Sequence, residues 1–175
     1  MSRRFMLQKI IFAIGHDMWV MDEHNQKVYL IDNKVVALRK TFIMYDMQHQ
    51  EVLKIQQQPL HLHKTITIDH HGKEVAQVQK AWLTILRDKW NIQIPGGEDL
   101  VAMGDLLDHE YHITRNNQTI ADISKHWFTI RETYGVEVFD DTEAPLMIAL
   151  AVAIDEMMHE AHDEATEHHD AKPPQ

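Results

Sequence analysis

One ten-residue pattern occurs four times along the chain, and it constrains the fold more than any other feature of the sequence. The copies are residues 19–28 (WVMDEHNQKV), 43–52 (IMYDMQHQEV), 66–75 (ITIDHHGKEV) and 111–120 (YHITRNNQTI). Each copy has apolar or aromatic residues at its first and third positions, then Asp or Thr, a polar stretch, and a final Val or Ile. Such alternation, interrupted by turn-forming residues, is typical of a strand, a tight turn and a second strand. The sequence therefore predicts a β-hairpin that recurs about every 23–24 residues, except that the interval before the last copy is about twice as long.

The last two copies stay similar beyond the turn, where residues 75–85 (VAQVQKAWLTI) align with residues 120–130 (IADISKHWFTI). The matched Lys80 and Lys125 precede the matched Trp82 and Trp127. We interpret the tryptophans as core residues and the lysines as strand ends, and a paired surface site is the alternative. The apolar alternation changes parity near each lysine, which predicts a bulge or corner there.

Near the C-terminal end, the alternation of apolar and polar residues gives way to a continuous apolar run. Residues 146–154 are nine consecutive apolar residues that follow an acidic, proline-containing start typical of a helix N-terminus. A helix of that length spans only about 14 Å, so it must be buried in protein. The many short strands of residues 5–139 indicate an antiparallel sandwich or barrel, and a barrel closed around this helix accounts for both. We expect Leu146, Ile148, Leu150 and Ile154 in the core, and Asp155 with Glu156 near the barrel mouth.

Composition narrows the classes of function. The formal net charge of −10 argues against general nucleic-acid binding. The chain has no cysteine, which fits a reducing compartment, and the apolar run at residues 10–14 is too short for a secretory signal. We therefore expect a cytoplasmic protein without a transmembrane segment, folded as one domain over residues 1–165 with a polar tail at 166–175.

No set of residues specifies a reaction. Ser2 and Ser124 are the only serines, and neither lies in a nucleophile elbow. The His pairs at 109 and 112 and at 159 and 162 have i,i+3 spacing, whereas a zinc-protease helix needs i,i+4. We expect no catalytic residue, no cofactor and no metal, although His159, His162 and Asp163 could together hold a surface metal.

Three segments of the chain resemble the LURP-one-related family. They are residues 8–29 (QKIIFAIGHDMWVMDEHNQKVY), residues 104–138 (GDLLDHEYHITRNNQTIADISKHWFTIRETYGVEV) and residues 144–155 (APLMIALAVAID). The family fold is that of the tubby C-terminal domain and is shared with phospholipid scramblases. The resemblance implies a closed barrel of about a dozen strands with the C-terminal helix threaded through it. Tubby proteins bind phosphoinositides and scramblases act on membranes with calcium, but this chain has no matching lipid-site residues and no calcium loop.

The sequence favours a mainly β, non-catalytic soluble protein that binds a lipid headgroup or a protein partner. Lys80, Lys125 and Arg131 are the candidate ligand-binding residues. The alternatives are a membrane-associated lipid-handling protein of scramblase type and, less favoured, an enzyme working in a cavity beside the helix.

Overall fold

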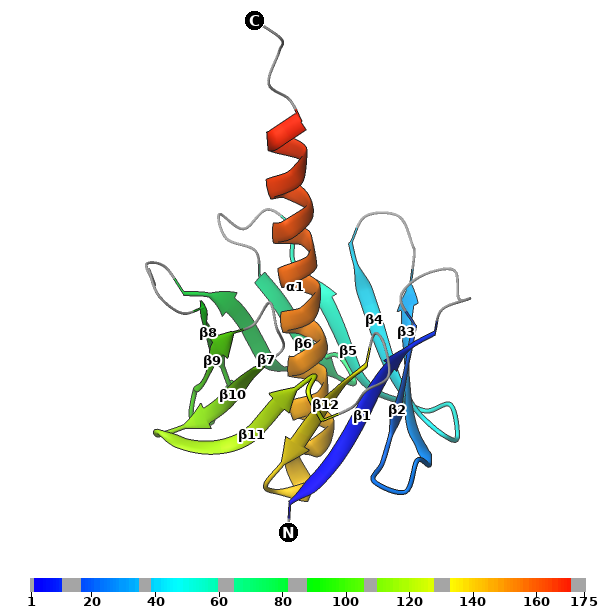
Figure 1. The fold of residues 1–175 in the computed structure, drawn as a ribbon. Coiled ribbons are helices and arrows are strands. Elements are labelled where there is room, and N and C mark those ends of the chain that lie inside the picture. Colours follow the sequence, from blue (N-terminus) through cyan, green and yellow to red (C-terminus); the bar gives the residue numbers. More distant parts are fainter. Residues whose placement is uncertain are drawn as a thin grey trace, which may run out of the picture.

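The computed structural model describes residues 2–10, 17–34, 39–59, 65–81, 88–105, 110–127 and 133–170, and for residue 88 and residues 159–170 it describes the backbone only. These ranges contain twelve strands and one long helix (Figure 1). The strands are β1 (Arg3–Lys9), β2 (Met18–Met21), β3 (Lys27–Lys34), β4 (Thr41–Asp46), β5 (Glu51–Gln57), β6 (Thr65–His70), β7 (Lys73–Lys80), β8 (Asp88–Gln93), β9 (Leu100–Asp105), β10 (Glu110–Arg115), β11 (Gln118–Ser124) and β12 (Thr133–Val138). A 3-10 turn, η1 (Asp141–Glu143), leads into α1 (Ala144–Asp170).

The twelve strands form one closed antiparallel barrel. Each strand pairs with its neighbours in sequence, and β1 closes the barrel by pairing with β12. Because the strands run alternately up and down, the β2–β3, β4–β5, β6–β7, β8–β9 and β10–β11 turns all lie at one end, which we call the hairpin end (Figure 1). The opposite end, where α1 leaves the barrel, is the mouth. The prediction of a closed barrel of about a dozen strands around a C-terminal helix is confirmed.

The four copies of the ten-residue pattern form four of these hairpins. In the first two copies the aspartate caps the turn: the Asp22 carboxylate accepts hydrogen bonds from the backbone amides of His24 and Gln26, each at 2.9 Å. Asp46 does the same for the amides of Gln48 and Gln50. The third loop residue then has the left-handed conformation, at φ +58° and +59° respectively, as three-residue hairpin loops require.

The other two copies have two-residue turns, at residues 71–72 and 116–117. All four turn residues have positive φ, as the type I′ hairpin turn demands: His71, Gly72, Asn116 and Asn117. Glycine and asparagine adopt this conformation at the lowest cost, which explains their place in the pattern.

A β-bulge lies at the tenth residue of every copy. In the first copy the register passes from Val20–Tyr29 to Met21–Lys27, so Val28 has no residue opposite it. The same step occurs at Val52, Val75 and Ile120. All four residues are partly buried against the core. Since a bulge bends and twists its strand, four equivalent bulges curve the hairpins toward closure.

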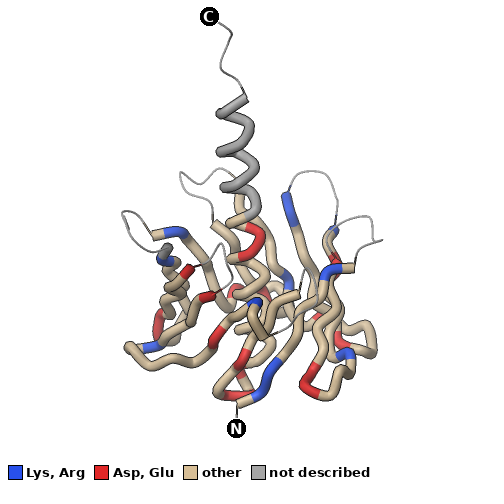
Figure 2. The backbone as a smooth tube through the Cα atoms, viewed as in Figure 1, with Lys and Arg blue, Asp and Glu red and all other residues tan. Residues whose placement is uncertain are grey.

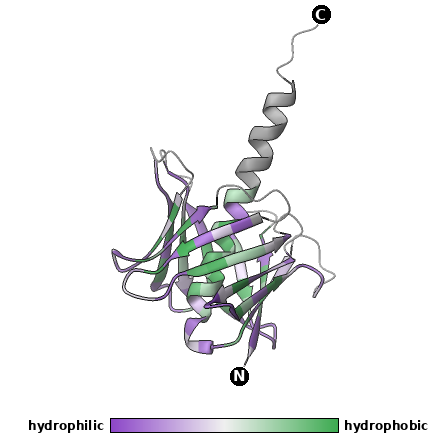
Figure 3. Ribbon diagram, turned by 90° about the vertical axis from the view of Figure 1, so that its left-hand side faces the viewer, coloured by the Kyte–Doolittle hydropathy of each residue, from purple (hydrophilic) through white to green (hydrophobic). Residues whose placement is uncertain are grey.

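The helix fills the barrel that the strands surround (Figure 3). Residues 147–158 of α1 are all buried, and the α1 backbone comes closest to β5, β6, β7 and β12. The inward-facing residues of the strands complete the core, for example Leu7 on β1, Ile68 on β6 and Ile113 on β10. The apolar stretch of the sequence therefore packs against protein on every side.

Two details differ from or extend the sequence expectations. The bulges lie at Val75 and Ile120, whereas the sequence predicted a bulge or corner near Lys80 and Lys125; β7 ends at Lys80, and β11 ends one residue before Lys125. The predicted boundary between domain and tail at residues 165 and 166 falls inside α1, which runs to Asp170.

Candidate functional site

The two acidic residues predicted near the mouth lie there, buried against the barrel wall. Asp155 and Glu156 are each only 6% exposed. Lys9, the last residue of β1, places its Nζ 3.6 Å from the Asp155 carboxylate, and Lys40, just before β4, pairs with Glu156. These pairs attach the helix to the wall where the acidic segment of α1 leaves the barrel (Figure 2).

The candidate ligand-binding lysines also belong to the mouth but do not lie on adjacent strands. The Lys80 ammonium lies 5.9 Å from the ring centre of Trp90. Lys125 follows β11, and its backbone amide donates to the Glu110 carboxylate at 3.0 Å. Three strands, β8 to β10, separate β7 from β11. Arg131 lies outside the described residues.

The core candidates divide into three groups. Ile148, Leu150 and Ile154 are 0–1% exposed, and Leu146 packs partly buried against the core. Trp127 is partly exposed and lies outside the buried core, with the Arg4 guanidinium 4.9 Å from its ring centre. Trp82 lies outside the described residues. The fully buried tryptophan of the described part is Trp90, at 2% exposure.

Glu110, from the segment that resembles a zinc-protease signature, has a structural role; His109 lies outside the described residues. One carboxylate oxygen of Glu110 accepts hydrogen bonds from the Ser124 hydroxyl at 2.7 Å and from two backbone amides after β11. Glu110 therefore links the start of β10 to the end of β11, at the open end of this hairpin. Within the described ranges, no three His, Asp or Glu side chains converge in an arrangement that could hold a metal ion.

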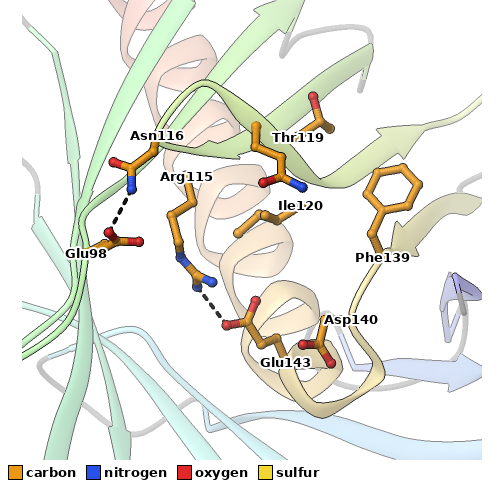
Figure 4. A pocket seen from close by; sticks show the side chains of 9 residues that line it. Glu98, Arg115, Asn116, Thr119, Ile120, Phe139, Asp140 and Glu143 are labelled. Atoms are coloured by element: carbon orange, nitrogen blue, oxygen red, sulfur yellow. Dashed lines mark hydrogen bonds and ion pairs between the residues drawn. The ribbon is translucent and has the colours of Figure 1, made fainter.

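The hairpin end carries a surface pocket of about 290 Å³ (Figure 4). It opens between the β8–β9 turn, the β10–β11 hairpin and the chain that enters η1. Its walls are Glu98, Arg115, Asn116, Gln118, Thr119, Ile120, Phe139, Asp140 and Glu143. One of the four bulge residues, Ile120, thus forms part of the wall.

Hydrogen bonds and an ion pair fix the polar groups of this pocket. Arg115 donates to the Glu143 carboxylate at 2.7 Å, and the Asn116 amide donates to the Glu98 carboxylate at 2.7 Å (Figure 4). The hydroxyl and backbone amide of Thr142 donate to Asp140 and hold the pKa of its carboxyl below the ordinary value. Asp140 therefore stays ionised at neutral pH.

The resulting site is acidic and partly aromatic. Three carboxylates and one guanidinium line the pocket, which gives it a formal charge of −2. Phe139 is 42% exposed and is one of two large hydrophobic residues exposed in the described ranges, the other being Met47 in the β4–β5 turn. Negative charge beside an exposed aromatic ring is the combination that attracts an organic cation.

Sequence reasoning missed this pocket. Its residues come from three segments that the barrel brings together, and the acidic run at 140–143 was interpreted only as a helix start. The fourth copy of the pattern contributes five of the lining residues, but nothing in it distinguishes a pocket wall from an ordinary turn.

Across the ranges for which coordinates are described, no helix is both long and apolar enough to cross a membrane.

Comparison with known proteins agrees with the fold. The X-ray structure of a protein from Arabidopsis thaliana superposes with a TM-score of 0.66 at 9% identity, covering 89% of this chain and 91% of that one. A relative in Bacillus subtilis (strain 168), named Uncharacterized protein YxjI, is 23% identical over 165 residues, or 94% of this chain and 99% of YxjI. The model of the LURP-one-related family matches residues 3–155. The resemblance read from the sequence is thereby confirmed, and the chain belongs to the LURP-one-related family.

Proposed function

We propose that this protein is a non-catalytic binding protein that recognises a positively charged group of a protein partner in the pocket at the hairpin end. The observation that carries the proposal is the pocket itself, whose lining combines three carboxylates with a single arginine and the exposed ring of Phe139. Its volume lies at the lower limit of small-molecule sites and suits one side chain rather than a large ligand.

The closed barrel supports recognition through side chains. A sheet with a free edge can bind a peptide as an added strand, but here β1 and β12 pair and complete the ladder. The lumen is occupied by buried residues of α1, which disfavours an enzyme with a cavity beside the helix. A partner therefore has to dock on the outer surface, and a basic group complements the acidic pocket.

The alternative of an anionic lipid headgroup is weaker. Two of the mouth lysines, Lys9 and Lys40, already pair with carboxylates of α1.

The proposed setting is the cytoplasm, which the absence of cysteine supports.

A peptide titration tests the proposal. Acetylated and amidated tetralysine should shift the amide resonances of Asn116, Phe139 and Glu143 in ¹⁵N spectra of the full chain, whereas the matched tetraglutamate should not. Phe139→Ala should weaken binding about two- to fivefold, the worth of an exposed cation–π contact. Glu98→Gln should weaken it further and flatten its dependence on salt.

Met47→Ala and Glu23→Gln are the matched controls, because they make the same types of change in other turns of the hairpin end. Equal binding of both peptides, or equal loss in the controls, would exclude the pocket as the site. Tight, salt-insensitive binding to anionic vesicles at pH 7.5 would instead support the lipid-handling alternative.

A further inference from the structure

We propose that the two ion pairs at the mouth set the depth of α1 in the barrel and thereby hold the pocket at the hairpin end in its binding shape. This inference rests on the proposed function, because it concerns regulation of the same pocket. Lys9 and Lys40 are then positioning residues that act on the pocket through the helix.

The apolar part of α1 determines its own depth in the barrel only weakly. Residues 147–154 are apolar on every face of the helix and are 0–1% exposed. A shift by one turn, about 5.4 Å, would exchange apolar neighbours for other apolar neighbours. Hydrophobic burial therefore selects the helix as the occupant of the barrel but discriminates weakly between positions along its axis.

The ion pairs at the mouth favour one position of the helix along the barrel axis. Asp155 and Glu156 follow the apolar stretch directly, and their side chains are 6% and 8% exposed. Lys9 and Lys40 reach them from β1 and from the segment before β4, so any shift of the helix would leave buried carboxylates without their partners. Leaving a buried charge unpaired is far more costly than moving an apolar contact, and such pairs are known to fix register.

The hairpin end is the other attachment point. Glu143 directly precedes α1, and its carboxylate lies 2.7 Å from Arg115 across the pocket. Asp141, in the same short turn, pairs with Arg3 on β1, where both side chains are more exposed. A shift of one helical turn would separate Glu143 from Arg115 and open the wall of the pocket.

A stiff helix joins the two ends. Thirteen residues separate Glu143 from Glu156, which is about 20 Å of helix. Because α1 moves as a unit, both the ion pairs at the mouth and the geometry of the pocket depend on the position of the helix along the barrel axis. A partner or modification that breaks the mouth pairs would then weaken binding at the far end of the molecule.

The test replaces the mouth pairs with apolar residues so that no buried charge is left unpaired. The variant is Lys9→Met/Lys40→Met/Asp155→Leu/Glu156→Leu in the full chain. It should fold, because replacing a buried ion pair by apolar residues is often tolerated. We expect the amide resonances of residues 139–144 and the side-chain resonances of Arg115 to broaden or double, and tetralysine affinity to fall at least about fivefold.

Two further variants complete the design. Lys54→Met is the matched control, since Lys54 pairs with Asp69 at 3.9 Å and alternates along β5 with the core residues Leu53 and Ile55, so it lies on the outer face of the barrel. It should leave the pocket resonances unchanged. The swap Lys9→Asp/Asp155→Lys keeps the pairing and should retain sharp pocket resonances, which keeps the test valid if the fourfold variant fails to fold.

The outcomes separate the two proposals. If tetralysine does not bind the natural protein, the proposed function fails, while the resonances of residues 139–144 still report the coupling. Unchanged pocket resonances in a folded fourfold variant would overturn the coupling, whatever the peptide does. Disturbed resonances in the swap variant would also contradict it, because the pairing is retained there.

Discussion

At the residue scale, two buried tyrosines lie beside an acidic group of the helix. Tyr111 and Tyr134 face the lumen at 4% exposure each. Burial, and then the negative charge of Asp155, raise the pKa of both hydroxyls well above the ordinary value. The Tyr111 hydroxyl has no hydrogen-bond partner within the described part of the chain, so nothing there favours its ionised form.

This arrangement predicts instability in alkali. Tyrosine in the unfolded chain has a pKa of about 10. The folded protein keeps both hydroxyls protonated at that pH, because their pKa values are raised. Above that pH the unfolded state binds fewer protons, so the free energy of unfolding should fall by about 1.4 kcal/mol per pH unit for each tyrosine. Urea unfolding between pH 9 and 11.5 measures the slope. Tyr111→Phe/Tyr134→Phe should flatten it, and an unchanged slope in that variant would contradict the assignment.

A second prediction concerns the tryptophans. Trp90→Ala should cost roughly 3–5 kcal/mol, as truncation of a buried aromatic residue does. Trp127→Ala should cost clearly less, because that ring is partly exposed against Arg4. For Trp82→Ala we expect, from the sequence alone, a loss of roughly 3–5 kcal/mol in the free energy of unfolding. Lys80→Ala and Lys125→Ala should change stability far less than any buried tryptophan. Thermal and urea unfolding compare the five variants, and equal losses at Trp90 and Trp127 would argue against this ranking.

At the scale of elements, α1 is the core of the barrel. Ile148→Asp or Leu150→Asp places an unpaired charge where the natural residue is fully buried, and should cost several kcal/mol. Gln93→Asp, at an exposed position of β8, is the matched control and should be nearly neutral. A chain truncated before Ala144 should not fold. A soluble truncated product that melts cooperatively would refute the central role of the helix.

The hairpins could be read from the sequence because their determinants are local. The aspartate of copies one and two caps its own turn, and the Gly or Asn of copies three and four adopts positive φ within the same four residues. The tenth residue was recognised as a recurring Val or Ile, yet its role as the bulge was not, because a bulge is defined only by the opposite strand.

The pocket could not be read in this way. Glu98, Arg115 and Glu143 are separated by 17 and 28 residues, and they meet only because β9 pairs with β10 and because η1 follows β12 at the same end. Each of these residues is ordinary in its local context. Sequence reasoning could find the strands that carry the pocket, but their closure decides which turns become neighbours.

At the scale of the whole molecule, charge should control contact with membranes. The formal charge is −10 at neutral pH, and protonation of all 14 histidines would bring it to +4. We expect negligible binding to anionic vesicles at pH 7.5, and stronger, salt-sensitive binding near pH 5.5 as histidines gain charge. Co-sedimentation across pH measures this, with circular dichroism to show an intact fold at each point. Binding that is independent of pH would contradict the prediction.

The position of α1 in the chain has a consequence for synthesis on the ribosome. The helix follows all twelve strands, and β1 pairs with β12 across more than 120 residues, so closure cannot precede the emergence of β12 and filling cannot precede that of residues 144–158. Until then the inner faces of the strands remain exposed to water, a state that favours aggregation and slow folding. Nascent chains should therefore be captured by holding chaperones and should gain protease resistance abruptly, once the last apolar turn has left the exit tunnel.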